Sequence, residues 1–137
     1  MLLIPLQPTD AKILSVVEAW VDVLANGQFE SALAIVEHNP VRTASELKEL
    51  IEGYGRMPPH GHVSTRITPP RAAIVADISP SHHVTWFGPH PDRAVELEAF
   101  VTYDLPVNGV WSDLTALFWL KRISHGYVLQ LEDIHVL

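Results

Sequence analysis

The 137-residue sequence contains no cysteine, and charged residues make up only 18% of it. The lack of cysteine excludes disulfides, thiolate nucleophiles and cysteine-ligated zinc together, and it fits a reducing compartment, so we expect a cytoplasmic protein. Lys and Arg number 9 against 16 Asp and Glu, and the net charge of -7 has the wrong sign for binding phosphates. We therefore expect neither nucleic acid nor a membrane as a partner.

Long apolar runs are also missing. The apolar N-terminal stretch Met1 to Leu6 is short and is interrupted by Pro5, so we expect neither a signal peptide nor a membrane span there. Hydrophobic residues nevertheless make up 47% of the chain, which is enough for the core of one domain of this size. Residues 1–137 are expected to form a single domain.

The first half of the chain is predicted to be helical, because its apolar residues recur at a spacing of three and four. Side chains that can cap a helix and glycines that can end one bound these stretches. The predicted helices run from Thr9 or Asp10 to Asn26-Gly27, from Phe29 to Val36, and from the capping box at Thr43 to the glycines Gly53 and Gly55.

The second half is predicted to form strands, because the apolar period falls to two. The predicted strands are Val63 to Thr68, Arg71 to Ile78, His82 to Phe87, Ala94 to Val107, Val110 to Ile123 and Tyr127 to Val136. Pro69-Pro70 indicates an edge or a bend between the first two. The fold class is thus α+β, with three N-terminal helices packed on a curved, mainly antiparallel sheet.

Asn108-Gly109 is a strong signal for a two-residue hairpin turn, and it sets a register for the two longest strands. Counting outward pairs Tyr103 with Leu114 and Ala99 with Phe118 on the core face, and Phe100 with Leu117 and Glu98 with Trp119 on the other face. The second set is a mixed surface, and Phe100, Leu117 and Trp119 form an apolar patch on it that is expected to be the interface of a homodimer.

The same register sets Asp104 opposite Asp113. Like charges so close are costly unless a donor, a cation or a shared proton intervenes. Two interpretations follow: a functional carboxylate pair, or two solvated side chains that splay apart, which is the expectation we favour.

The last strand has two registers, and both remain open. If Leu129 and Leu131 face the core, alternation brings Asp133 and His135 to the same face, near Tyr103. These three residues would then be candidate catalytic groups: His135 as base, Asp133 as its orienting partner and Tyr103 as hydrogen-bond donor. A bulge near Glu132 would instead turn Ile134 and Val136 inward and leave the Asp and His on the surface.

The histidines give only a weak metal signal. They are His60, His62, His82, His83 and His90. Neighbouring strand residues point to opposite faces and no carboxylate lies at a ligand spacing, so neither a metal nor another cofactor is expected.

Three N-terminal helices, the first ending in Asn26-Gly27, followed by the long strands of residues 94–137, resemble the nuclear-transport-factor-2-like superfamily. The resemblance covers nearly the whole chain and implies a cystatin-like cone with a pocket, and commonly a dimer formed through the sheet. The pocket it implies here would be lined by Trp20, Tyr103, Leu114, Phe118, Asp133 and His135. Members include isomerases and lyases as well as binding, transport and toxin-immunity proteins.

Two functions are therefore expected from the sequence. The first is a non-enzymatic binding or interaction module that takes a small apolar ligand or a protein partner. The alternative is a cofactor-independent isomerase or lyase acting on a small apolar molecule through His135, Asp133 and Tyr103.

Overall fold

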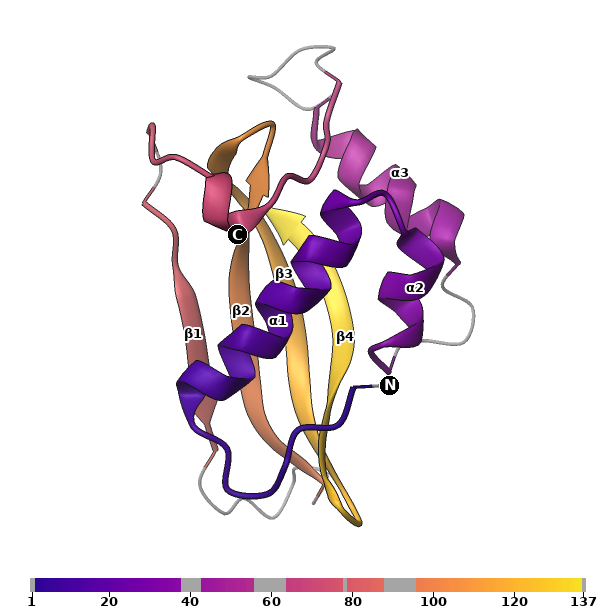
Figure 1. The fold of residues 1–137 in the computed structure, drawn as a ribbon, viewed down its shortest axis with the longest axis vertical. Coiled ribbons are helices and arrows are strands. Elements are labelled where there is room, and N and C mark those ends of the chain that lie inside the picture. The colour runs from indigo at the N-terminus through magenta and orange to yellow at the C-terminus, as the bar shows by residue number, and fades with distance from the viewer. Residues whose placement is uncertain (1, 38–42, 56–63, 78, 88–95, 137) are drawn as a thin grey trace.

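The computed structural model describes residues 2–37, 43–55, 64–77, 79–87 and 96–136. Within these ranges the chain forms three helices and one antiparallel sheet, which confirms the α+β class (Figure 1). The helices are α1 (Asp10–Ala25), α2 (Phe29–Ala34) and α3 (Ala44–Tyr54). The strands are β1 (His82–Trp86), β2 (Leu97–Val107), β3 (Val110–Ile123) and β4 (Gly126–Val136). Neighbouring strands pair in the order β1-β2-β3-β4, and the sheet formed by these described strands does not close on itself.

The helices begin where side chains satisfy their first backbone N–H groups. Thr9 Oγ1 accepts from the Lys12 N–H at 3.1 Å, and Thr43 Oγ1 accepts from the Glu46 N–H at 3.1 Å. Gly27 follows α1 with φ +74°, a conformation that glycine adopts without a steric penalty. The caps predicted for the first and third helices are thus confirmed.

Helix α2 is shorter than predicted and ends at Ala34. The chain leaves the helix there and runs beside β4: the Glu37 N–H donates to the Leu129 carbonyl at 2.8 Å, and the Leu131 N–H donates to the Glu37 carbonyl at 2.7 Å. These two bonds satisfy backbone groups at the edge of the sheet, which explains why residues 35–37 do not continue the helix.

The two strands predicted on either side of Pro69-Pro70 do not form in the part of the chain that the structure describes. Residues 64–77 instead contain a short 3-10 turn at Pro70–Ala72 and two single bridges, Ile67 to Val107 and Ile74 to Val110. Prolines lack the N–H that a ladder needs, so pairing stops after one bridge on each side.

The hairpin turn is confirmed, with φ +52° at Asn108 and φ +83° at Gly109. Val107 pairs with Val110 as predicted, but beyond Pro106 the register shifts by two residues, so that Phe100 pairs with Trp119 and not with Leu117. A second shift near Glu98 follows further along β2. Because the first shift moves the register by an even number of residues, every side chain around it stays on its predicted face of the sheet.

Ser112 holds the first shift in place. Residues 112–114 of β3 together stand opposite the single residue Leu105. The Ser112 hydroxyl donates to the Leu105 carbonyl at 2.7 Å and accepts from the Leu114 N–H at 3.2 Å. One buried side chain thereby serves two backbone groups where the strands separate.

The shift also separates the two aspartates that were expected to face each other. Asp104 now pairs with Thr115, whose hydroxyl donates to it at 2.9 Å. Asp113 accepts from the Tyr54 hydroxyl at 2.6 Å. Each carboxylate therefore has its own donor, and no carboxylate pair forms.

The core lies between α1 and the sheet. Helix α1 crosses one face of the sheet, whereas α2 and α3 lie beyond β4 (Figure 1). We call the face under α1 the inner face and the opposite one the outer face. Trp20 of α1 packs edge-to-face on Phe118 with ring centroids 5.1 Å apart, and its indole N–H donates to the Ala32 carbonyl at 3.1 Å. Both rings are fully buried.

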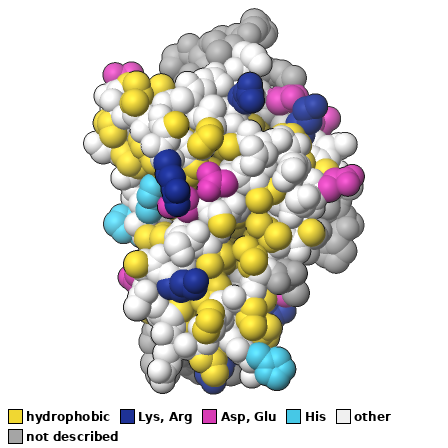
Figure 2. Space-filling model, in the orientation of Figure 1, with side chains coloured by type: hydrophobic (Ala, Val, Ile, Leu, Met, Phe, Trp, Pro, Cys, Tyr) yellow, Lys and Arg dark blue, Asp and Glu magenta, His cyan; other side chains and the backbone are white. Residues whose placement is uncertain are grey.

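Figure 2 shows the surface on the side of α1, where the described side chains of different kinds are mixed. Lys and Arg side chains are scattered there among acidic and apolar ones (Figure 2).

Candidate binding site on the outer face of the sheet

A bulge in the last strand decides which side chains reach the outer face. Leu117 pairs with Asp133 and Phe118 with Leu131, so Glu132 is an extra residue on β4. The second of the two registers left open is therefore the observed one. Ile134 is buried against the core, while Asp133 and His135 lie on the outer face. Val136, at the end of the strand, is exposed rather than buried.

Tyr103 lies on the inner face, opposite to Asp133 and His135. It stacks on His82 with ring centroids 3.7 Å apart and is 3% exposed. Burial, with a further contribution from Glu18 and Asp22 of α1, raises the pKa of Tyr103 to about 12. The predicted catalytic combination of these three residues needed a shared face, and the structure does not bring them together.

The predicted ligand pocket is divided in the same way. Trp20, Leu114 and Phe118 are packed in the core beside Tyr103. Asp133 and His135 are separated from them by the thickness of the sheet. The six residues therefore do not line one pocket.

The outer face carries a groove with a volume of about 470 Å³. It is lined by Thr85, Phe87, Phe100, Leu117, Trp119, Glu132, Asp133 and His135. The three residues predicted for a dimer interface, Phe100, Leu117 and Trp119, all belong to it. Its other members come from β1, from the residue after β1 and from β4.

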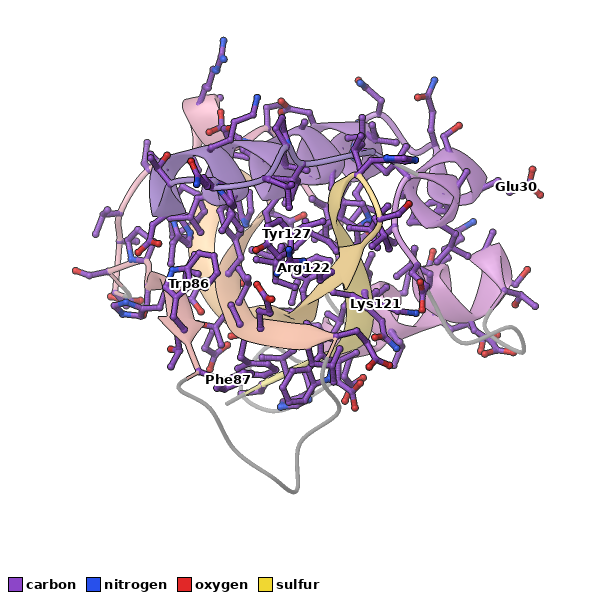
Figure 3. The ribbon with its side chains drawn as sticks, turned by 90° about the horizontal axis from the view of Figure 1, so that it is seen from below. Glu30, Trp86, Phe87, Lys121, Arg122 and Tyr127 are labelled. Carbon is purple, nitrogen blue, oxygen red and sulfur yellow. The ribbon has the colours of Figure 1, made fainter. Side chains whose placement is uncertain are left out.

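Aromatic rings form much of this groove. The Trp119 ring lies 4.9 Å from that of Phe100 and 5.7 Å from that of Phe87, with interplanar angles of 56° and 47°. Phe87 extends the pairing of β1 by one residue, since its N–H donates to the Glu98 carbonyl at 3.0 Å. Figure 3 shows Phe87 on the side of the sheet away from α1, whereas Trp86 lies on the side of the helix.

Acidic groups lie along one side of the groove. Trp119 Nε1 donates to Glu132 Oε2 at 3.1 Å. Asp133 Oδ2 lies 2.7 Å from His135 Nδ1, and its other oxygen accepts from the Ile134 N–H at 2.8 Å. These contacts hold both carboxylates at the edge of the aromatic surface.

Thr85, Phe87 and Glu132 were not foreseen as members of a site. The sequence did contain a signal for Thr85 and Phe87. Alternation along β1 puts them on the same face as each other, and Thr85 pairs with Phe100. Glu132 reaches the groove only because of the bulge, which sequence alone left undecided.

Other parts of the described chain offer weaker sites. Among the described residues, no group of three His, Asp or Glu side chains could hold a metal ion. His82 and His83 point to opposite faces as expected, and His60, His62 and His90 lie outside the described residues. A hollow of about 220 Å³ beside Tyr54 and Trp111 is half the size of the groove.

Within the described ranges, no helix is both long enough and apolar enough to cross a membrane. Comparisons of the chain with protein-family models, with curated proteins and with solved structures give no match.

Proposed function

We propose that this chain is a non-enzymatic binding module and that the groove on the outer face of the sheet takes a small, largely apolar ligand. The observation that carries the proposal is the group of three aromatic rings and Leu117 on a face that none of the described helices covers. A groove of about 470 Å³ lies within the range of small-molecule sites, which are mostly apolar with a few polar groups that orient the ligand.

The inner side of the sheet supports a binding role over catalysis. The residues expected to line a reaction pocket there are packed against one another, and Trp20 and Phe118 are fully buried. The isomerase or lyase alternative required Tyr103 to lie near Asp133 and His135. Tyr103 is on the inner face, whereas Asp133 and His135 are on the outer face. In the groove, Asp133 and His135 act as polar groups that orient a ligand.

A homodimer formed through the outer face is the second candidate. It is favoured by the same apolar surface, since Phe100 and Trp119 are only partly buried. A second copy would cover the groove, so the two occupants compete.

We also propose that the fold belongs to the nuclear-transport-factor-2-like superfamily. The support is the order of its elements, with three helices followed by long antiparallel strands that end near the C-terminus. A binding role without catalysis is found among members of that superfamily, including toxin-immunity proteins.

Ligand binding by designed variants tests the function. We expect 2-phenylethanol, a small neutral aromatic, to bind with a Kd of about 1 mM, measured by NMR titration. Trp119→Ala removes a ring of the groove, and Thr85→Trp fills the groove from an exposed position, so each should weaken binding about tenfold. Trp86→Ala, which removes a 41% exposed tryptophan from the other face, is the control.

Two results would contradict the proposal. One is the absence of binding to the native protein. The other is equal weakening by Trp86→Ala and Trp119→Ala, which would place the ligand elsewhere. Light scattering on the same samples distinguishes the second candidate: a stable dimer that Thr85→Trp dissociates would show that the groove is covered by a second copy.

A further inference from the structure

We infer that the β1 edge, formed by the backbone of His82, Val84 and Trp86, pairs with the same edge of a second copy of this chain. The two strands run antiparallel about a twofold axis at Val84 and join the two sheets into one continuous sheet. This inference goes beyond the proposed function, because the groove opens on the outer face of each sheet, whereas the hydrogen bonds of this dimer lie along the edge.

Part of the backbone of β1 points away from the sheet. Just after the strand, the Phe87 N–H donates to the Glu98 carbonyl of β2 at 3.0 Å. Residues of an antiparallel strand direct their backbone groups alternately to its two sides, so the odd-numbered residues of β1 face β2. The backbone groups of His82, Val84 and Trp86 therefore point outward, where none of the segments that the structure describes pairs with them.

The two edges of the sheet differ in how they are covered (Figure 1). At β4, Ile4 and Tyr127 exchange two backbone hydrogen bonds of 2.8 and 2.7 Å, and Glu37 bonds to the same edge. Covering an edge in this way protects it from pairing with another chain, as do prolines, lysines and bulges within an edge strand. Strand β1 has no proline, lysine or bulge, and no described segment covers it.

The sequence of β1 is complementary to itself in an antiparallel arrangement. With Val84 opposite its own copy, His82 lies opposite the partner subunit's Trp86, and His83 lies opposite the partner subunit's Thr85. Pairs of aromatic and of β-branched side chains are favourable across strands, and each outward N–H meets a carbonyl. The strand contains no Asp, Glu, Lys or Arg, so the twofold axis brings no like charges together here, although the chain carries a net charge of -7.

Trp86 adds an apolar side chain to this edge. Its ring is 41% exposed, and its indole N–H donates to Asp10 Oδ1 at 2.7 Å, which holds the ring on the side of α1. Tryptophan is enriched in protein interfaces, where its ring is buried. Pairing of the two edges places the partner subunit's His82 beside this ring and covers part of it.

Amide hydrogen exchange, measured by NMR over a range of protein concentrations, tests the inference without any substitution. We expect a weak dimer with a Kd of about 10–100 µM. The Val84 N–H should then exchange about threefold more slowly in a sample of about 1 mM than in one of about 0.05 mM, because a smaller fraction of the chain is monomeric. The N–H of Val75, whose side chain is 58% exposed outside the strands, should not change.

Two matched proline variants locate the interface. Val84→Pro removes the outward N–H at the twofold axis, and an edge strand tolerates proline where the N–H points to solvent, so the circular dichroism spectrum should be retained. Light scattering should show a Kd raised at least about tenfold. Val75→Pro makes the same replacement away from the edge and should leave the Kd unchanged. If Val84→Pro fails to fold, the exchange measurement on the native protein still decides.

The outcomes separate this inference from the proposed function. A protein that is monomeric at about 1 mM, or a Val84 N–H that exchanges at the same rate at all concentrations, overturns the inference and leaves the groove as a binding site. A dimer that Thr85→Trp dissociates and Val84→Pro does not is formed through the outer face, and the proposed function then fails as well. If the protein stays monomeric and an added peptide of alternating Val and Thr protects the Val84 N–H, the edge takes a peptide and the inference is also overturned.

Discussion

Replacing Ser112 by alanine tests whether its hydroxyl holds the shifted register of the central hairpin. The side chain is 6% exposed and bonds two backbone groups, the Leu105 carbonyl at 2.7 Å and the Leu114 N–H at 3.2 Å. Loss of the partner of a buried polar group costs about 1–3 kcal/mol. Because two such groups are affected, Ser112→Ala should lower the free energy of unfolding by about 2–4 kcal/mol.

Urea denaturation followed by circular dichroism measures this cost. The midpoint should fall by roughly 1–3 M with an unchanged slope, since the surface exposed on unfolding stays the same. Ser15→Ala is the matched control: its hydroxyl donates to the Lys12 carbonyl at 2.7 Å on the exposed surface of α1, and its removal should change stability by less than about 0.5 kcal/mol. If the two variants were equally stable, the hydroxyl of Ser112 would not be what maintains the bulge.

Further predictions concern the core and two titrating groups. Phe118→Ala should destabilise the fold by about 3–5 kcal/mol in the same assay, because the ring is fully buried; a loss below about 1 kcal/mol would mean that the site is loosely packed. Burial lowers the pKa of His82 below 6.5, so the unfolded chain takes up a proton first and stability should fall as the pH drops below that value. His82→Phe, which keeps a ring stacked on Tyr103, should lose this part of the pH dependence of stability. If the variant and the native protein had the same pH dependence, His82 would not be its cause. Tyr54→Phe should cost about 1–2 kcal/mol at pH 7 by removing the 2.6 Å bond to Asp113. Because burial and that bond raise the pKa of Tyr54 to about 12, the native protein, unlike the variant, should lose this stabilisation as the pH rises above 10; equal losses in both would contradict the assignment.

The features that were predicted correctly depend on neighbouring residues. Thr9 and Thr43 cap helices whose first N–H groups are three residues away, and Asn108-Gly109 forms a turn from its own backbone preferences. The face of each hairpin residue was also correct up to the second shift near Glu98, because alternation survives a shift of two.

The features that were missed depend on contacts between distant parts of the chain. The early end of α2 follows from bonds between Glu37 and β4, and the separation of the two aspartates follows from the bulge that Ser112 stabilises. The bulge at Glu132 could be foreseen as an alternative, because Leu131 and Ile134 cannot both face the core without one. Packing decides which of the two registers forms. The register in turn decides whether His135 faces the core or the groove.

NMR observation of the tryptophan indole N–H groups tests most directly whether the groove beside Trp119 is the binding site. The chain has four tryptophans, so each gives a separate signal. During titration with 2-phenylethanol, we predict that the signal of Trp119 shifts progressively while that of Trp20, buried on the other side of the sheet, stays in place. Shifts confined to Trp20, Trp86 or Trp111, or no shift at all, would contradict the account.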